Sequence, residues 1–188
     1  MNDDAIYETP IFVRRVGENG YLAHRAVYAA MGEPNKDLQR DFIFDLESIA
    51  MEDGNFVVVR SARMPRGGVG SRVELPAEDE YAFHLRAVPL RGSSKRGGID
   101  SDPGRLFWLD RQAALNGFRI QGTPQMTVRS RHFFNRNEHL TVLETRFEGR
   151  LAVVDRGKFQ AAWLNGVGRK RGFGFGMLHL SDISAKDN

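Results

Sequence analysis

Hydrophobic and polar residues are arranged along the first third of the chain in a pattern that predicts three strands and one helix. Runs rich in β-branched and aromatic residues predict strands over residues 9–16, 41–47 and 55–62. Between the first two strands, Asn19 is a suitable N-cap for a helix that extends from about residue 20 to residue 32. The predicted order of these elements is β-α-β-β.

The predicted helix has two distinct faces at the helical period of about 100° per residue. The apolar face is made of Leu22, Ala23, Ala26, Val27 and Ala30. The opposite face carries Tyr21, His24, Arg25 and Tyr28. Polar and aromatic side chains that segregate in this way are candidates for binding or chemistry.

After an interruption, the rest of the chain predicts the order β-α-β-β-α-β. Residues 63–77 are too rich in Gly and Pro for a regular helix, and they predict a loop. The later elements are predicted at these ranges: strand 80–88, helix 104–116, strands 118–134 and 139–154, helix 155–165 and strand 173–180. Gly117 is expected to stop the first of these helices and Asp155 to cap the second.

The order β-α-β-β-α-β is that of a ferredoxin-like unit, and the first third of the chain repeats its beginning. The pattern therefore predicts an α+β fold of tandem ferredoxin-like units. The predicted N-terminal domain covers residues 1–77 and has lost its second helix to the 63–77 loop. The predicted C-terminal domain covers residues 78–188.

Composition limits the kinds of site that the chain can contain. The 188 residues include no cysteine, which excludes disulfides, cysteine-zinc sites and thiol nucleophiles. The five histidines show no metal-ligand spacing, and neither a metal nor a cofactor is expected. No apolar run approaches the ~20 residues that span a bilayer, and the N-terminus lacks the features of a secretion signal. A cytoplasmic location without membrane association is expected.

Charge is distributed unevenly along the chain, although the net charge is only +3. Residues 1–52 contain 10 acidic and 5 basic side chains, whereas residues 112–188 contain 6 acidic and 12 basic ones. This asymmetry favours a polyanion bound on one face, and nucleic acid is one candidate.

A glycine-rich basic segment near the C-terminus, Gly-Val-Gly-Arg-Lys-Arg-Gly-Phe-Gly-Phe-Gly at 166–176, is a candidate phosphate-binding loop. It matches neither a Walker P-loop nor a dinucleotide fingerprint, because a helix precedes it and a strand is predicted after it. Its candidate RNA-binding residues are Gly166, Gly168, Arg169, Lys170, Arg171, Gly172, Gly174 and Gly176. The structural alternative is a tight connection whose glycines only permit close packing.

Other basic residues extend this candidate surface. Arg129 and Arg131 alternate on one strand, and Arg136 lies at the predicted hairpin turn. Lys95 and Arg96 lie in a second Gly/Ser-rich loop, and Arg25 lies on the polar face of the first helix. The hairpin arginines suit a nucleic-acid groove, and exposed strands also carry arginine for solubility alone.

Tyr21 and His24 are the candidate catalytic residues. They are three residues apart on a helix, so their side chains are neighbours. Histidine exchanges protons near neutral pH, and a tyrosine hydroxyl can position a nucleophile or a phosphate. The alternative is that His24 is a structural or exposed helix residue.

Three segments of the chain resemble the CasE family of CRISPR-associated endoribonucleases, a branch of the RAMP superfamily. The first is Asn-Gly-Tyr-Leu-Ala-His-Arg-Ala at 19–26, and the second is Phe-Glu-Gly-Arg-Leu at 147–151. The third is the glycine-rich segment at 166–176, in which Gly172 is an addition to the family pattern.

The resemblance implies cleavage of CRISPR precursor RNA within its repeat hairpins. It implies attack by an RNA 2′-hydroxyl without metal, with products that end in a 2′,3′-cyclic phosphate and a 5′-hydroxyl. His24 would be the general acid/base, Tyr21 would orient the 2′-hydroxyl, and the glycine-rich loop would hold the RNA backbone. The implied partners are precursor and mature CRISPR RNA and other subunits of a CRISPR effector complex. The alternatives are a non-catalytic subunit that binds the repeat hairpin, and a small-ligand or protein-binding module without an RNA role.

Overall fold

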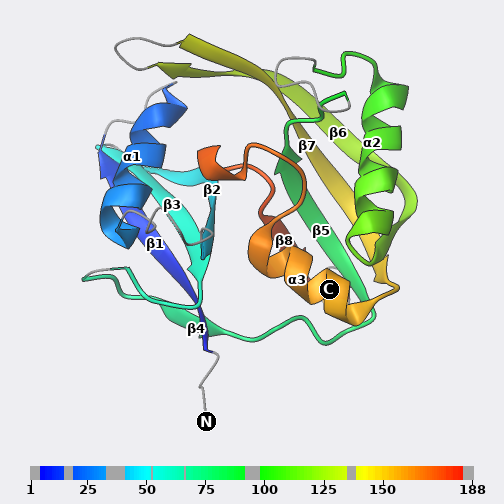
Figure 1. Ribbon diagram of the computed structural model, residues 1–188, viewed down its shortest axis with the longest axis horizontal. Helices are drawn as coiled ribbons and strands as arrows, with labels where there is room; N and C mark the ends of the chain where they lie inside the picture. The colour runs from blue at the N-terminus through cyan, green and yellow to red at the C-terminus, as the bar shows by residue number, and fades with distance from the viewer. Residues whose placement is uncertain are drawn as a thin grey trace.

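Two antiparallel four-stranded sheets form the frame of the protein in a computed structural model (Figure 1). The structure describes residues 5–14, 19–32, 41–51, 53–65, 67–91, 98–134 and 139–183, without the side chains of 47–51. The first sheet contains β1 (Ile6–Arg14), β2 (Phe42–Met51), β3 (Gly54–Ser61) and β4 (Ser71–Val73). The second contains β5 (Glu80–Ala87), β6 (Phe118–Phe134), β7 (His139–Val153) and β8 (Leu178–Ser181).

Both sheets have the same topology. The strand order is β2-β3-β1-β4 in the first sheet and β6-β7-β5-β8 in the second. Each sheet therefore has its second, third, first and fourth strands in that spatial order, as expected for repeated ferredoxin-like units. The predicted α+β fold class and the tandem arrangement are confirmed.

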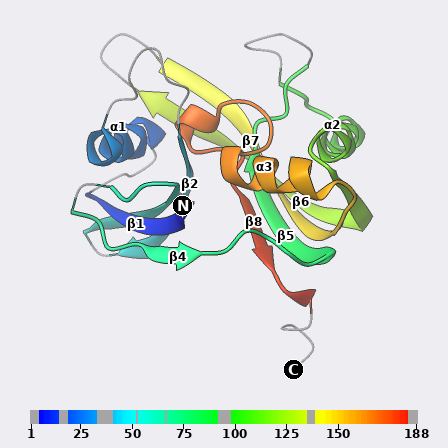
Figure 2. The ribbon, with the colours of Figure 1, turned by 60° about the horizontal axis from the view of Figure 1, so that its bottom comes forward.

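Three α-helices lie on one side of the two sheets (Figure 2). Helix α1 (Gly20–Met31) belongs to the first unit, and α2 (Asp102–Leu115) and α3 (Arg156–Asn165) belong to the second. Asn19, Ser101 and Asp155 accept hydrogen bonds from backbone N–H groups of the first turns of these helices. Among the described residues between β3 and β4 there is no helix, so the first unit is abbreviated as predicted. No helix in the described part of the chain is long and apolar enough to cross a membrane.

The prediction of a strand over residues 173–180 is wrong in its first half. The chain instead forms a single 3₁₀ turn, η1 (Arg171–Phe173), and β8 begins only at Leu178. Gly174 and Gly176 have φ angles of +82° and +88°, which extended strands do not adopt. The predicted loop at 63–77 differs in a smaller way, because it contains the short edge strand β4. The predicted turn at 135–137 lies outside the described residues.

Two hydrophobic cores fill the space between the helices and the sheets. The second core is made entirely of residues from β5 onward, among them Leu85, Leu109 and Phe147. The first core combines α1 and the first sheet with four buried side chains from the second half: Val88, Phe133, Val142 and Phe175. The predicted boundary after residue 77 lies between the two sheets, and the division into two domains there stays a prediction.

Candidate active site

The start of α1 is fastened to the end of β6. The Asn19 side chain accepts a hydrogen bond from the Tyr21 N–H at 3.1 Å and another from the Phe134 N–H at 2.9 Å. Its amide Nδ2 also donates to the Phe134 carbonyl at 3.1 Å. A Cβ on Gly20 would come within 2.5 Å of the Phe133 ring, so this residue allows the close approach. The β6 strand therefore fixes the helix that carries both candidate catalytic residues.

His24 lies in an aromatic cluster. Its ring centroid is 5.5 Å from that of Tyr21, 4.3 Å from that of Tyr28 and 5.3 Å from that of Phe173. Tyr21 and Tyr28 come from the same helix face, as the sequence predicted. Phe173 comes from the glycine-rich loop, and no sequence signal had assigned it to the site. The rings restrict the orientation of the imidazole before any substrate binds.

A hydrogen bond from His24 to the glycine-rich loop determines which nitrogen of its ring can exchange a proton. Nδ1 of His24 lies 2.6 Å from the Gly172 carbonyl oxygen. Because a carbonyl oxygen can only accept, Nδ1 carries a hydrogen and donates it. In the neutral ring Nε2 is then the basic nitrogen, and in the protonated ring Nε2–H is the acid. The structure thus brings together two segments that are almost 150 residues apart in the sequence.

An open hollow of about 480 Å³ lies beside His24. It is lined by Tyr21, His24, Arg25, Tyr28, Ala29 and Gly32. Arg25 is exposed at its edge. The hollow combines a proton-exchanging group, phenol rings and a cation, which are suitable groups for a phosphodiester.

Backbone conformation and close packing explain why glycine occurs at several positions of the loop. Gly166, Gly168, Gly174 and Gly176 all have positive φ angles. A Cβ on Gly174 would lie 2.6 Å from Leu46 Cγ and 2.7 Å from a Phe44 ring atom, both on β2. The Gly174 carbonyl also accepts a hydrogen bond from the Leu46 N–H at 3.3 Å. Gly174 therefore lets the loop pack against the first sheet, and the contact of the loop glycines with RNA stays a prediction.

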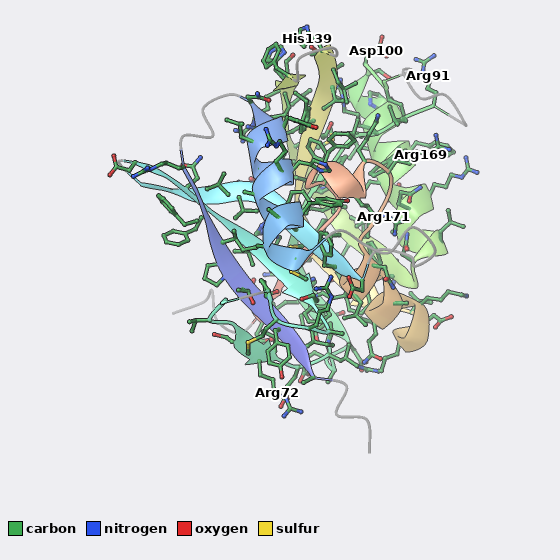
Figure 3. All side chains as sticks on the ribbon, turned by 60° about the vertical axis from the view of Figure 1, so that its left-hand side comes forward. Arg72, Arg91, Asp100, His139, Arg169 and Arg171 are labelled. Atoms are coloured by element: carbon green, nitrogen blue, oxygen red, sulfur yellow. The ribbon has the colours of Figure 1, made fainter. Side chains whose placement is uncertain are left out.

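The three loop cations differ in their surroundings. Arg171 is half-buried and donates to the carbonyls of Asn165 at 2.9 Å and Gly166 at 3.4 Å, so it braces the loop from within. Nζ of Lys170 lies 5.6 Å from the Phe173 ring centroid, and Arg169 is exposed. Figure 3 shows the loop beside α1, with Arg169 and Arg171 labelled. Lys170, which lies beside the ring that stacks on His24, is therefore the loop cation best placed to meet a ligand there.

The hairpin arginines belong to a different cluster. Arg129 and Arg131 pair with Glu144 at 3.1 and 3.0 Å, and the Glu144 side chain is completely buried. Their charge is therefore partly neutralised within the protein. Lys95, Arg96 and Arg136 lie outside the described residues, so their placement stays a prediction.

A buried polar network at the junction of the two sheets was not found from the sequence. Asp45 of β2 contacts the Arg86 guanidinium and lies 2.7 Å from Nε2 of His179. Burial alone would raise the pKa of Asp45, but the His179 hydrogen bond and the Arg86 charge outweigh it and hold this pKa well below its usual value. Burial, followed by the neighbouring His179, lowers the pKa of His84 to about 4. Residues so distant in the chain give no spacing signal.

Comparison with known proteins identifies the family to which the chain belongs. A family model described as CRISPR associated protein matches residues 4–181, almost the whole chain. The chain belongs to this family.

Individual relatives are similar to the chain over nearly their full lengths. The Escherichia coli K12 protein named CRISPR system Cascade subunit CasE is 24% identical and covers 92% of this chain and 97% of its own length. The Thermus thermophilus CRISPR-associated endoribonuclease Cse3 is 25% identical, with 89% and 92% covered. A structure of Thermus thermophilus Cse3 bound to an RNA representing a pre-cleavage complex superposes with a TM-score of 0.75 at 23% identity, covering 94% of this chain and 99% of that one.

Proposed function

We propose that this protein is a CRISPR RNA-processing endoribonuclease that cuts precursor RNA within its repeat hairpins. The observation that carries the proposal is the fixed imidazole of His24. It is held through Nδ1 by the loop carbonyl of Gly172 and packed beside Tyr21. Two relatives that match over nearly their full lengths support cleavage of RNA. One is named as a Cascade subunit, and the other is named as an endoribonuclease and has a structure with RNA bound.

The proposed reaction is an internal transesterification. The RNA 2′-oxygen attacks the adjacent phosphorus, and the bond from phosphorus to the 5′-oxygen of the next nucleotide breaks. The 2′-hydroxyl gives its proton to a water molecule, and the protonated His24 gives its Nε2 proton to the leaving 5′-oxygen. The products end in a 2′,3′-cyclic phosphate and a 5′-hydroxyl. Tyr21 orients the attacking hydroxyl or stabilises charge on the phosphorane.

The donor set around His24 supports a reaction that needs no metal ion. Among the described residues, the only cluster of three potential metal ligands consists of Asp45, His84 and His179, and it does not include His24. Proton transfer by a positioned side chain is typically worth ~10²–10⁴-fold in rate, which is a sufficient contribution for a single general acid.

The RNA backbone would be held by cations around the hollow. Arg25 lines the hollow, and Lys170 lies beside the Phe173 ring that stacks on His24. A repeat hairpin is A-form, so it is recognised mainly through its shape, its phosphates and its 2′-hydroxyls. The Cascade subunit among the relatives supports the proposal that the protein stays bound to its product within a complex of other subunits.

The decisive test is cleavage of a repeat-hairpin RNA in EDTA by the wild type and by His24→Ala. We expect the wild type to cut and the variant to be ~10²–10⁴-fold slower with nearly unchanged RNA binding. His132→Ala is a matched control, because His132 lies at the exposed end of β6 and makes no contact with His24. Its rate should equal that of the wild type.

Two further outcomes separate the alternatives. If the wild type binds the hairpin tightly and never cuts it, the protein is a non-catalytic binding subunit. If it cuts and His24→Ala cuts equally fast, the endoribonuclease stands and the assigned general acid is wrong. A single deoxyribose 5′ to the cut should block cleavage and preserve binding, because it removes only the attacking hydroxyl.

A further inference from the structure

The two sheets meet at their edge strands, and three metal-binding side chains converge there. Asp45 lies on β2, the edge of the first sheet, and His179 lies on β8, the edge of the second. His84 lies on β5, directly opposite His179 in the strand register. One ligand atom from each of these three residues lies within 4.8 Å of the others.

The three side chains are held in place by their neighbours. The second oxygen of the Asp45 carboxylate, Oδ2, lies 2.7 Å from His179 Nε2, and its other oxygen, Oδ1, contacts the Arg86 guanidinium. The His84 and His179 rings are stacked, with centroids 4.2 Å apart and an interplanar angle of 12°. The Asp45 side chain is almost completely buried, and both histidines are half-buried. The group is therefore ordered from both sheets.

We propose that Asp45, His84 and His179 form a binding site for a divalent transition-metal ion at the junction of the two sheets. The donor set is two imidazoles and one carboxylate, which suits zinc, nickel, cobalt or iron rather than magnesium or calcium. This site is separate from His24, and nothing in the cleavage reaction depends on it.

Metal binding requires two small changes in geometry. Zn–N and Zn–O bonds are ~2.0–2.2 Å long and each Zn–N bond lies in the plane of its imidazole, so two ligand atoms on one tetrahedral ion are about 3.3 Å apart. His179 Nε2 and Asp45 Oδ2, now 2.7 Å apart, must separate slightly. The His84 ring must turn from its stacked position so that its ligand nitrogen points between them and comes closer.

An open position remains for a water or a further ligand. His84 and His179 line a polar hollow of about 670 Å³ together with Gln121, Gln125, Arg146 and Glu148. Three protein ligands with one open position are typical of a reactive or exchangeable site rather than a closed structural one. We therefore expect reversible binding.

Some charged groups around the site oppose the binding of a cation, and others favour it. Arg86 opposes a cation, but it also fixes the Asp45 carboxylate so that Oδ2 faces the histidines. Glu144 lies 3.8 Å from Arg86 and offsets part of its charge, and Arg146 at the hollow is paired with Glu148. The metal takes the place of a proton between Asp45 and His179, so its binding weakens as pH falls.

A metal at this position would join the two halves. Asp45 belongs to the first sheet and both histidines to the second, so the ion would link β2 to β5 and β8. A ligand that binds only the folded state raises the melting temperature by mass action. At a free metal concentration about 100 times the Kd, the expected rise is about 5 °C or more for a chain of this size.

The test uses the untagged full-length protein, stripped with EDTA and dialysed, with Zn²⁺ as the titrant in calorimetry. We expect one Zn²⁺ per chain and a visible absorption band when Co²⁺ is used instead. His84→Phe keeps the ring stack and loses the ligand, and His179→Gln keeps a donor to Asp45 and loses the imidazole. Each should weaken binding by at least ~10-fold.

A matched control identifies binding elsewhere. His132 and His139 form a second histidine pair at the exposed end of β6 and β7, with ring centroids 5.8 Å apart. His139→Phe should leave the Zn²⁺ stoichiometry and affinity unchanged. The proposal is overturned if the wild type binds no Zn²⁺, or if binding survives His84→Phe and His179→Gln but disappears in His139→Phe.

Melting curves without metal show whether each variant is folded. The Zn²⁺-dependent rise in melting temperature must be present in the wild type and in His139→Phe and clearly smaller in folded His84→Phe. A rise of equal size in all three also overturns the proposal. These measurements use no RNA, so they give the same answer whether or not the protein cuts RNA.

Discussion

The two halves of the protein share one topology, but only the second has a core of its own. The second core contains no residue from before β5. The first core is completed by Val88, Phe133, Val142 and Phe175 from the second half. The described residues of the first unit contain no second helix, and the glycine-rich loop of the second unit packs on its β2 strand.

This difference explains how the candidate site is assembled at the loop. The segment that supports the first unit also supplies the Gly172 carbonyl that holds His24 and the Phe173 ring that stacks on it. The C-terminal loop thus lies against the helix that carries the proposed general acid. We therefore expect folding of the first unit and assembly of the site to depend on the same contacts.

The largest expected effect comes from dividing the chain after residue 77. We expect a 78–188 fragment to fold cooperatively, because its core is complete. A 1–77 fragment should not fold, because about a third of its core side chains are absent and small domains have little stability to lose. Far-UV circular dichroism and urea unfolding of both fragments test this.

A cooperative urea transition in the isolated 1–77 fragment would show that the first unit does not need residues 78–188 to fold. It would support two independent domains. Addition of 78–188 to 1–77 gives a second measurement. Helical signal gained only in the mixture would show that the missing side chains, rather than the sequence of the first unit, limit its folding.

A pair of phenylalanines tests the same dependence within the full chain. Phe175 is 1% exposed in the first core, and Phe147 is 0% exposed in the second. Replacement of either by Ala should cost about 3–5 kcal/mol of the free energy of unfolding. Hydrogen exchange separates them, since Phe175→Ala should lower protection in α1 and β2, and Phe147→Ala should lower it in β5 to β7.

Equal loss of protection across both sheets in both variants would contradict the comparison, because it would mean that the two cores unfold as one unit. A loss of RNA cleavage in Phe175→Ala alone would connect the first core to the site. That result is expected, because Phe175 lies two residues from Phe173 and in the same loop.

Local sequence patterns predicted most of the fold for identifiable reasons. The Asp155 cap, the stop at Gly117 and the buried face of α1 at Ala23 and Val27 are properties of neighbouring residues, and each is present in the structure. Leu22 was wrongly placed on that buried face, because it is 38% exposed. The start of β8 was misplaced because Phe173 and Phe175 alternate like strand residues. Gly174 and Gly176 have positive φ angles, and the contacts that require them, with β2 at Gly174 and with Val167 at Gly176, are made only in the folded structure.

The part of the candidate site that depends on local helix geometry was predictable, and the part that depends on contacts between the two units was not. Tyr21 and His24 could be paired from the sequence, because residues three positions apart on a helix have neighbouring side chains. The hydrogen bond from His24 to Gly172 could not be derived, since it depends on how the two units dock. The convergence of Asp45, His84 and His179 is hidden for the same reason, and their spacing in the sequence suggested no metal ligands.

A glycine substitution examines the docking of the loop on β2. Gly174→Val introduces a side chain against Leu46 and Phe44 in addition to the strain of a positive φ angle. We expect a loss of about 2–4 kcal/mol in the free energy of unfolding, with weaker RNA binding or slower cutting. Urea unfolding and single-turnover cleavage measure the two effects.

Gly122→Val is the matched control for that substitution. Gly122 has a φ angle of +67°, and a Cβ there would meet no atom within 4 Å. It should lose only the conformational cost, about 1–2 kcal/mol, and should cut RNA at the normal rate. Equal losses in both variants would mean that the loop has no tight contact with β2.

The smallest expected effect is a pH dependence of the junction between the halves, measured in EDTA. The folded protein lowers the pKa of His84 from 6.5 to about 4. The unfolded chain therefore binds a proton between these pH values that the folded chain does not, and the free energy of unfolding falls as pH is lowered through this window. Because His84 is half-buried and screened by solvent, about 1 kcal/mol is expected.

His84→Phe should flatten the stability profile between pH 6.5 and 4, because phenylalanine keeps the stack on His179 and does not titrate. Below this window the fall should become steeper in every variant, since the lowered pKa of Asp45 makes its carboxylate contribute stability that protonation removes. A profile for His84→Phe identical to that of the wild type would mean that His84 takes up its proton equally readily in the folded and unfolded chains, and that the junction does not keep this imidazole neutral.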